Sequence, residues 1–195
     1  MSEEKGLSNI DDRIWITSRV RMIAERKALR NQNISYMSVT YYSLFTVIVA
    51  VFSKFYVLTY PLLEEINLSA SVVVLVASLV SGGFRFETSA TVYRECYLKL
   101  QRLQGEDLPP EKKEEKYNEI LWDYPNHSNN EYYDFIINHA CLEGKKLTNG
   151  THELKPTAYM WFSYLFRRAF YYGTIVVLFT APVVFLGVPL IKLWK

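Results

Sequence analysis

Two long uncharged runs stand almost back to back in the first half of the chain, and they restrict the fold more than any other feature. No charged residue occurs in 31–53 or in 66–84. A helix needs roughly 20 apolar residues to cross the hydrocarbon core of a bilayer. The runs therefore predict a membrane hairpin with spans at 36–60 and 67–84, joined by a turn at Pro61–Ile66.

A third uncharged run occupies residues 169–191, near the C-terminus. Lys192 and Trp194 follow it, and both residue types favour the interface between membrane and water. Pro182 and Pro189 would damage a soluble helix, but in a membrane neighbouring groups can satisfy the carbonyls that proline leaves free. The run predicts a third, kinked span, with a re-entrant or interfacial segment as the alternative.

The polar segment before the first span is basic and has apolar residues at helical spacing from Asp11 or Asp12 onward. Its basic residues near the predicted membrane are Arg19, Arg21, Arg26, Lys27 and Arg30. A basic amphipathic helix beside a membrane often lies on anionic lipid, so we expect these residues to face lipid. The alternative is the solvated face of a helical bundle. The net charge of +2 gives no strong global field for nucleic acid.

The remaining segment, 85–168, is polar enough to be a soluble insert. Apolar residues at helical spacing predict a helix that continues out of the second span, and Pro109-Pro110 predicts the start of another. Ser128 is a suitable cap for a third helix, which we expect to reach Leu142. We expect Gly144–Pro156 to be a polar loop and the chain to contain no sheet, because no segment alternates between polar and apolar residues.

The predicted fold is an all-α membrane protein. Residues 1–35 form a cytoplasmic basic amphipathic helix, 36–84 a transmembrane hairpin, 85–168 a cytoplasmic helical insert, and 169–195 a third membrane helix and tail. Basic residues precede the first span and follow the second, whereas the hairpin turn carries two glutamates. Because basic residues favour the cytoplasmic side, we expect a cytoplasmic N-terminus.

Several short motifs, in this order, resemble the SLATT family of bacterial two-transmembrane effectors, and most of all the subgroup with an additional C-terminal membrane segment. They are Ser18-Arg19-Val20-Arg21 through Ala24-Glu25-Arg26, the membrane hairpin, Tyr93-Arg94-Glu95-Cys96-Tyr97-Leu98-Lys99-Leu100-Gln101, Tyr124-Pro125-Asn126-His127-Ser128, and Glu131-Tyr132. The resemblance covers nearly the whole chain.

The resemblance implies a membrane effector of a bacterial antiphage, abortive-infection system. Such an effector would assemble as a homo-oligomer in the inner membrane and permeabilise or depolarise it when triggered. The upstream partners that the resemblance implies are a nucleotide signal, a cyclic-nucleotide synthase or a reverse-transcriptase system. The alternative is a non-conducting membrane anchor that recruits a soluble partner enzyme.

No catalytic constellation stands out, and we expect neither an enzyme nor a bound cofactor or metal. The histidines His127, His139 and His152 lack metal-ligand spacing, and structural or surface roles are expected for them. The tyrosines of the insert could form a nucleotide-stacking pocket, but packing in the core is the preferred interpretation. These tyrosines include Tyr117, Tyr124, Tyr132 and Tyr133.

Small and polar residues recur in the second span. The candidates for pore lining or helix packing are Ser71, Ala77, Ser78, Ser81 and Gly82. Small residues four apart let helices approach closely in lipid. They predict either packing of the second span on the first, or a homo-oligomer whose pore is lined by the serine face. Gly82 and Gly83 are also the candidate hinge between the membrane helix and the insert.

Overall fold

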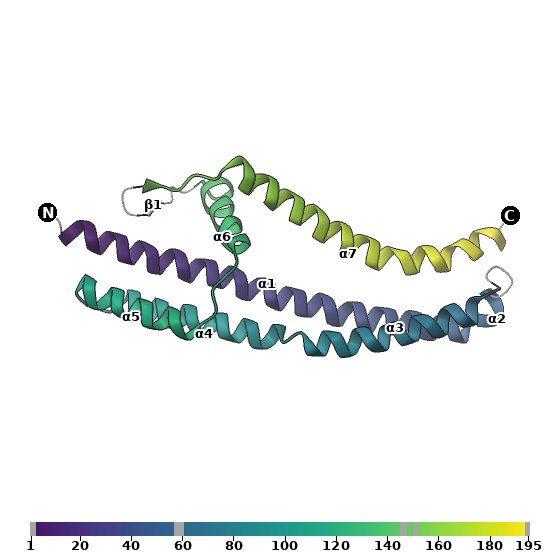
Figure 1. Cartoon of the computed structure of the whole chain (residues 1–195). Helices are drawn as coiled ribbons and strands as arrows, with labels where there is room; N and C mark the ends of the chain where they lie inside the picture. Colours follow the sequence, from purple (N-terminus) through teal and green to yellow (C-terminus); the bar gives the residue numbers. More distant parts are fainter. Residues whose placement is uncertain (1–2, 57–60, 145–147, 150–151, 194–195) are drawn as a thin grey trace. The chain divides into compact units, whose positions relative to one another are not determined.

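The computed structural model describes residues 3–56, 61–144, 148–149 and 152–193. In chain order its elements are α1 (Glu3–Val51), α2 (Ser53–Tyr56), α3 (Leu63–Gly83), α4 (Phe86–Gln104), α5 (Pro110–Asp123), α6 (Asn129–Ile136), the π-helix η1 (Ile137–Leu142), β1 (Thr148–Asn149), β2 (His152–Glu153) and α7 (Ala158–Leu193), as Figure 1 shows. Helices α1 and α7 and the pair α3–α4 each contain a segment long and apolar enough to cross a membrane. The expected all-helical membrane fold is confirmed.

The chain forms two compact units. The first consists of Met1–Leu29 with Phe86–Arg167, and the second of Arg30–Arg85 with Arg168–Lys195. Helices α1 and α7 therefore contribute residues to both units. The units divide after residues 29, 85 and 167, close to the sequence-based boundaries after residues 35, 84 and 168.

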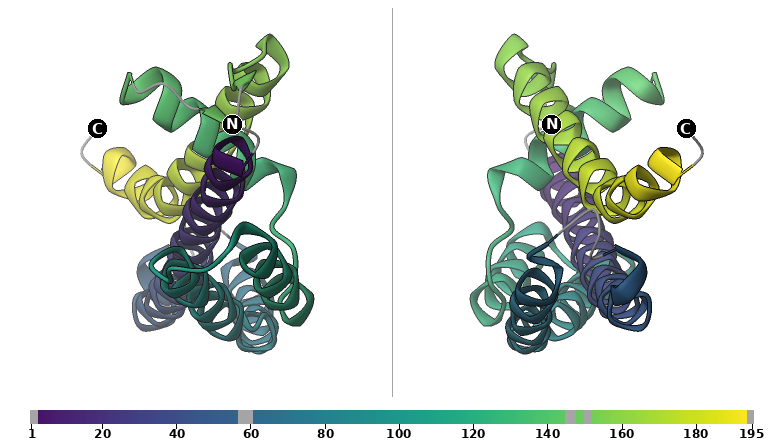
Figure 2. Two further views of the ribbon diagram at one scale, coloured as in Figure 1. Left: turned by 90° about the vertical axis from the view of Figure 1, so that its left-hand side faces the viewer. Right: turned by 90° about the vertical axis from the view of Figure 1, so that its right-hand side faces the viewer.

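In the first unit, α1 packs against the hairpin of α4 and α5, and the three helices lie side by side in the end-on views of Figure 2. The buried residues of this contact are Ile10, Ile14, Cys96, Leu100, Leu103 and Tyr117. Tyr117 also shares a hydrogen bond of 2.9 Å with the Thr17 hydroxyl. Tyr117 thus belongs to the core, as the preferred interpretation of the tyrosines predicts.

A second face of α1 packs against α6 in the same unit. Ile16 and Val20 of α1 are buried together with Phe135 and Ile136 of α6. The cap at Ser128 and the end of the helical segment at Leu142 agree with the sequence, although the winding changes to a π-helix after Ile136.

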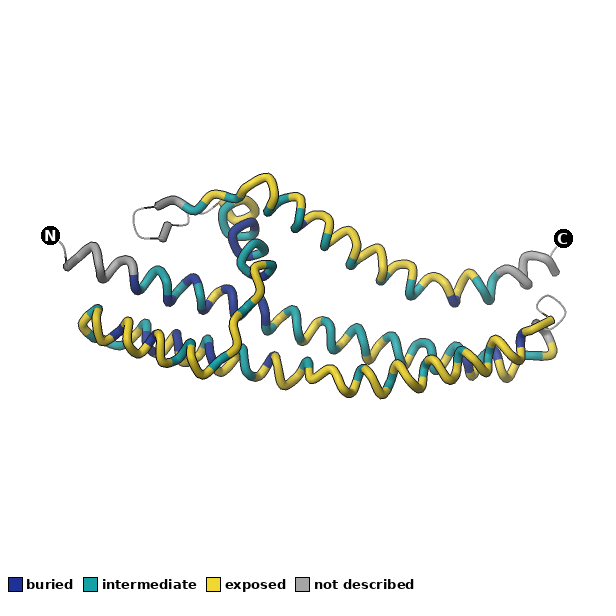
Figure 3. The backbone as a smooth tube through the Cα atoms, viewed as in Figure 1, coloured by how far each residue is buried: buried dark blue, intermediate teal, exposed yellow. Residues whose placement is uncertain are grey.

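In the second unit, most large apolar side chains have no protein cover. Within α3 only Leu63 is buried, whereas Leu79 is 70% exposed, and the exposed stretches of α3 and α7 are visible in Figure 3. A small core joins Val49 to Leu63, with Phe185 packed against it. Lipid is the solvent that an apolar surface of this extent requires.

Three boundaries differ from the sequence-based expectations. Helix α1 begins at Glu3 rather than at Asp11 or Asp12. Helix α3 begins at Leu63, inside the predicted turn, and so places Glu64 and Glu65 in its first turn, where carboxylates interact favourably with the helix dipole. The predicted continuous helix out of the second span is wrong, because Phe84 and Arg85 interrupt it between α3 and α4.

The expectation that the chain contains no sheet is also wrong. The two-residue strands β1 and β2 pair antiparallel within the predicted loop, with Thr148 opposite Glu153 and Asn149 opposite His152. The pair Asn149-Gly150 is a strong hairpin signal in any sequence. The flanking residues do not alternate in polarity, so the pattern of the segment does not predict strands.

Helix α7 continues through Pro182, and α1 supplies a donor for the carbonyl that this proline leaves free. Proline has no N–H, so the Leu178 carbonyl, four residues earlier, loses its partner in the helix. The Tyr42 hydroxyl donates to this carbonyl at 2.8 Å, and Tyr41 donates to the next one, of Phe179, at 2.9 Å. The chain bends in the C-terminal third of α7 (Figure 1). The prediction that neighbouring groups make proline tolerable is confirmed for Pro182.

We expect Tyr42→Phe to destabilise the detergent-solubilised protein by about 1 kcal/mol, because it leaves the Leu178 carbonyl without a donor. In a Pro182→Ala background, Tyr42→Phe should leave the free energy of unfolding almost unchanged, since alanine restores the N–H that bonds to the Leu178 carbonyl. Equilibrium unfolding of the four proteins measures this coupling. Tyr41→Phe is the matched control, and its cost should be the same in both backgrounds. An equal cost of Tyr42→Phe in both backgrounds would contradict the assignment.

Candidate functional site

The small and polar residues predicted in the second span lie on one face of α3. At 3.6 residues per turn, Ser78 and Ser81 fall in the middle of this face together with Asn67, and all three are half-buried. Ser71, Ala77 and Gly82 lie at its edges and are exposed. Besides Ser69, the opposite face carries mostly exposed valine and leucine side chains. They are Leu68, Val72, Val73, Leu75, Val76, Leu79 and Val80.

Polar groups on the small-residue face of α3 differ in how they are satisfied. The Ser71 and Ser78 hydroxyls donate to carbonyls of their own helix, at 2.9 and 2.8 Å, so they can lie in lipid without another partner. The buried Asn67 Oδ1 and Ser81 Oγ have no hydrogen-bond partner among the described residues. Asn67 also lines an apolar cavity of about 200 Å³ between α1, α3 and α7. Asn67 and Ser81 therefore retain capacity to bind water or a polar partner.

The candidate hinge coincides with the end of α3. Gly83 is the last helical residue, and its carbonyl accepts a hydrogen bond from the Arg85 amide at 3.0 Å. A side-chain carbon built on Gly82 or Gly83 would meet no atom within 4 Å, so neither glycine is required by close packing. A role as a hinge stays a prediction.

The expectation that the five basic residues of α1 face lipid is wrong for Arg21, which is wholly buried. Three of the others have partners within the chain. Lys27 forms an ion pair with Glu131, Arg19 lies over the Trp15 ring, and Arg30 lies 4.6 Å from the centre of the Tyr171 ring. Arg26 is exposed and donates to the Met22 carbonyl of its own helix.

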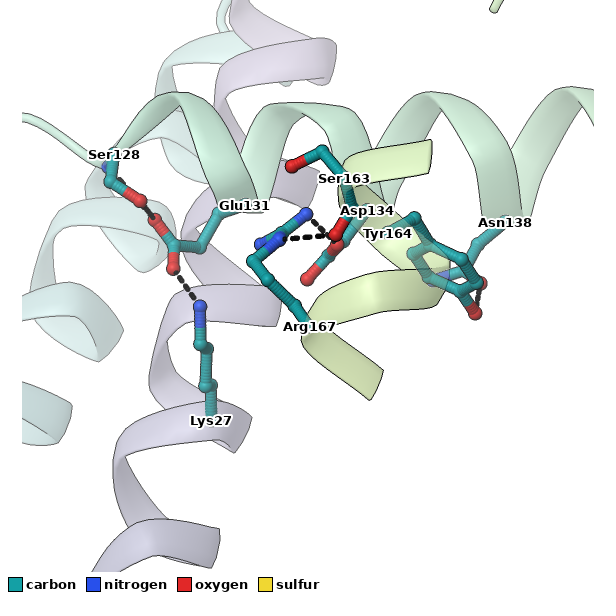
Figure 4. Close-up of polar contacts among 8 residues, drawn as sticks. All are labelled: Lys27, Ser128, Glu131, Asp134, Asn138, Ser163, Tyr164 and Arg167. Atoms are coloured by element: carbon teal, nitrogen blue, oxygen red, sulfur yellow. Dashed lines mark hydrogen bonds and ion pairs between the residues drawn. The ribbon is translucent and has the colours of Figure 1, made fainter. Parts of the chain in front are cut away.

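Two ion pairs hold α6 between α1 and α7, and we call them the α6 clamp (Figure 4). Lys27 Nζ of α1 lies 2.6 Å from Glu131 Oε1. Arg167 Nη2 of α7 lies 2.8 Å from Asp134 Oδ1. The two carboxylates are at positions i and i+3 of α6, so both ion pairs are made from one side of one helix. The clamp thus joins α6 to the two helices that continue into the second unit.

The first pair of the α6 clamp is the better shielded of the two. The Glu131 side chain is 9% exposed, and its other oxygen accepts hydrogen bonds from the amide and the hydroxyl of Ser128. Burial by itself would raise the pKa of Glu131, but the hydrogen bonds from Lys27 and Ser128 outweigh it, and the pKa lies below its ordinary value. Glu131 is therefore a fixed anion at neutral pH, which both caps α6 and anchors α1.

Arg21 lies beneath the linker that connects α5 to α6. Its Nη1 donates to the Pro125 carbonyl at 2.7 Å, whereas its Nε and Nη2 have no acceptor among the described residues. The nearby His127 Nδ1 is also buried without a partner. Burial, and then the charge of Arg21, lower the pKa of His127. An arginine cannot lose its proton in a protein, so this site holds a buried positive charge.

The other predicted groups have structural surroundings. His139 stacks on Phe135, with ring centres 5.6 Å apart, and lies edge-on to Trp15. The side chain of His152 lies outside the described residues. Tyr124 lies under Lys99, and Tyr133 contacts the Tyr159 ring, so the tyrosines of the insert are distributed over several contacts. Within the described part of the chain, no group of three His, Cys, Asp or Glu residues is arranged to hold a metal.

We expect Lys27→Met to destabilise the protein by about 1–2 kcal/mol, because it leaves the buried Glu131 carboxylate without its cation. Lys116→Met is the matched control. Its partner Glu106 is 37% exposed, so the loss should stay below about 0.5 kcal/mol. Equilibrium unfolding in detergent compares the two. Equal losses of unfolding free energy in Lys27→Met and Lys116→Met would contradict a stabilising role for the Lys27–Glu131 pair.

The same pair makes stability depend on pH. The pKa of Glu131 is lowered on folding from its ordinary value of 4.5. The contribution of the ionised Glu131 to the free energy of unfolding is therefore fully present above pH 4.5. It is lost as the pH falls below this value through the pKa of the folded state. We expect Glu131→Gln to flatten the loss of stability below pH 4.5. An unchanged pH profile would show that other groups dominate acid unfolding.

Comparison with known proteins identifies the family to which the chain belongs. The model of the SMODS and SLOG-associating 2TM effector domain family 5 matches residues 3–188. Searches of curated proteins and of solved structures gave no match. The matched range includes α1, α3 and the α6 clamp, and most of α7, whose apolar segment is additional to the two spans in the family's description. The chain therefore belongs to the SMODS and SLOG-associating 2TM effector domain family 5.

Proposed function

We propose that this chain is a membrane effector of a bacterial antiphage system, which oligomerises and depolarises the inner membrane when it is triggered. The observation that carries the proposal is the surface of α3. One face has mostly exposed valine and leucine, and the other has small residues with two unsatisfied polar atoms, Asn67 Oδ1 and Ser81 Oγ. Such a helix suits lipid on one side, and on the other a water-filled path that would open where this face now packs against α1 and α7 of the same chain.

The α6 clamp is suited to transmit a signal to this helix assembly. Lys27 lies two residues before the end of the first unit in α1, and Arg167 is the last residue of that unit in α7. A change in the insert that moves α6 would therefore act on both helices where they leave the unit. The mechanism needs no bond chemistry, only two arrangements of the helices whose balance the trigger shifts.

The charge distribution supports an N-terminus and an insert on the cytoplasmic side, with the turn between α1 and α3 outside. In this orientation the insert is exposed to cytoplasmic signals. The proposed upstream partner is a nucleotide signal from a cyclic-nucleotide synthase, or a reverse-transcriptase system. Arrest of infected cells by loss of membrane potential is the proposed outcome, as in abortive infection.

A second candidate is a non-conducting anchor that recruits a soluble enzyme. Trp122, on the last turn of α5, favours it, because its side chain is 90% exposed and a large exposed aromatic residue is typical of a partner-binding surface. Both candidates require membrane location, and they differ in conductance.

Membrane potential in bacteria that express the chain at controlled levels tests the proposal. A potential-sensitive dye is read together with the entry of a large impermeant dye, and an inert three-span protein at equal expression is the control. Depolarisation before large-dye entry supports a small pore. An intact potential with the protein in the membrane, and also with its triggering partner present, would contradict it and favour the anchor.

We expect the double change Glu131→Gln, Asp134→Asn to increase depolarisation at equal expression without any trigger, because it removes both anions of the α6 clamp. Adding Ser78→Val and Ser81→Val should suppress the effect, since an apolar constriction excludes water. Val72→Ala with Val76→Ala, on the opposite face of α3, is the matched control and should leave it unchanged. Equal suppression by both pairs would contradict the assignment of the conducting face.

A further inference from the structure

The guanidinium of Arg21 presents an unused pair of donors. Nε and Nη2 lie on the same edge of the guanidinium, and neither has an acceptor among the described residues, although the side chain is wholly buried. Two parallel N–H groups on one edge match two oxygens of a carboxylate or a phosphate. Nη1, on the other edge, already holds the Pro125 carbonyl, so the free edge is fixed in position.

The acidic side chains around this part of the unit are engaged elsewhere. Glu25, one turn along α1, accepts a hydrogen bond from Tyr97. Glu131 pairs with Lys27 and caps α6 through Ser128, and Asp134 pairs with Arg167. No ion pair joins Arg21 to an acid within the described ranges. A buried arginine without a counter-charge is costly, and such sites commonly bind an anion.

The surroundings of Arg21 are electropositive. The charges of Arg21 and Lys99 both act on the buried Cys96 thiol, whose pKa burial nevertheless raises. Lys99 lies over the Tyr124 ring at the start of the linker. His127, on the linker itself, has a buried and unpartnered Nδ1 and is near enough to Arg21 for the arginine charge to lower its pKa. The buried charge of Arg21, with the exposed Lys99 nearby and an unpartnered ring nitrogen on His127, suits a phosphate group better than a single carboxylate.

We propose that Arg21, with His127, forms a binding site for the phosphate group of a small molecule, beneath the linker between α5 and α6. Arg21 would bind two phosphate oxygens through Nε and Nη2, and keep its contact with Pro125. The shared chemistry is a tetrahedral oxyanion, which free phosphate or a nucleotide can supply.

Access to this site depends on the linker. Residues 125–127 make no backbone–backbone hydrogen bond outside helices in the described structure, and Pro125 and Asn126 are exposed. The linker ends at Ser128, which bonds to Glu131 of the α6 clamp. A ligand bound below the linker at His127 would thus be connected to the clamp through Ser128, which follows His127 and bonds to Glu131. That this ligand is the trigger rests on the proposed function, whereas binding itself does not.

The test is binding to the full chain in a maltoside detergent, which contains no phosphate. The probes are inorganic phosphate, adenosine monophosphate and adenosine, read by calorimetry and thermal unfolding. We expect both phosphates to bind and to raise the unfolding midpoint, and adenosine to do neither. Tighter binding of the nucleotide than of inorganic phosphate would indicate a nucleotide source, and equal affinities would indicate free phosphate.

Arg21→Lys keeps the charge but loses the paired donors, so it should weaken phosphate binding by about tenfold or more. Arg26→Lys, on the exposed side of the same helix, is the matched control and should bind like the unmodified chain. In case Arg21→Lys fails to fold, hydrogen–deuterium exchange on the unmodified chain decides. Phosphate should then slow exchange at residues 124–131.

No phosphate-dependent change at residues 124–131, or equal binding by a folded Arg21→Lys protein, would overturn the site. Because these measurements involve no membrane potential, their failure is distinct from failure of the proposed function. Binding by a chain that never depolarises cells would retain the site and reject the effector mechanism.

Discussion

Apolar helices without protein cover are the constraint on which the rest of the structure depends. Surrounded by water, α3 would expose nearly all of its valine and leucine side chains. Surrounded by lipid, the same helix is stable, but every backbone group must then be bonded inside the protein. The consequence is visible at Pro182, where Tyr42 of α1 replaces the hydrogen bond that α7 cannot make to the Leu178 carbonyl, and Tyr41 adds a bond to the Phe179 carbonyl. Lipid thus explains both the exposed surface and the unusual position of the tyrosine donors.

A second consequence concerns the connection between the units. Helices α1 and α7 contribute residues to both units, and the polar contacts of α6 lie on these two helices. The contacts that matter are polar. Apolar packing of α6 on α1 is tolerant of sliding, but Glu131 and Asp134 fix the rotation of α6 against two different helices. The clamp therefore fixes one arrangement of α6 on α1 and α7.

Local features were predictable from the sequence, and long-range ones were not. The helix starts at Pro110 and after Ser128, and the three apolar spans, follow from capping, proline and uncharged length. The α6 clamp does not, because Lys27 and Glu131 are 104 residues apart and their pairing depends on how α6 crosses α1. The periodicity of α1 likewise predicts Arg21 on the polar side of the helix, because it contains no information about which distant segment covers this residue. In the fold, Arg21 is wholly buried and bonded to the Pro125 carbonyl of the linker. The break in the helix at Phe84 and Arg85 directly follows Gly82-Gly83. These glycines predict a hinge between the membrane helix and the insert, but they do not predict that the helix ends there.

Labelling of single cysteines along α3 with a membrane-impermeant thiol reagent tests most directly whether this uncovered helix crosses the membrane. Leu62→Cys, Leu75→Cys and Phe84→Cys are made in a chain whose exposed Cys141 has been replaced, with the buried Cys96 retained. The account predicts that in spheroplasts the first cysteine reacts from outside, the third reacts only after permeabilisation, and the middle one reacts in neither case. Reaction of all three from one side, or of Leu75→Cys as readily as its neighbours, would contradict it.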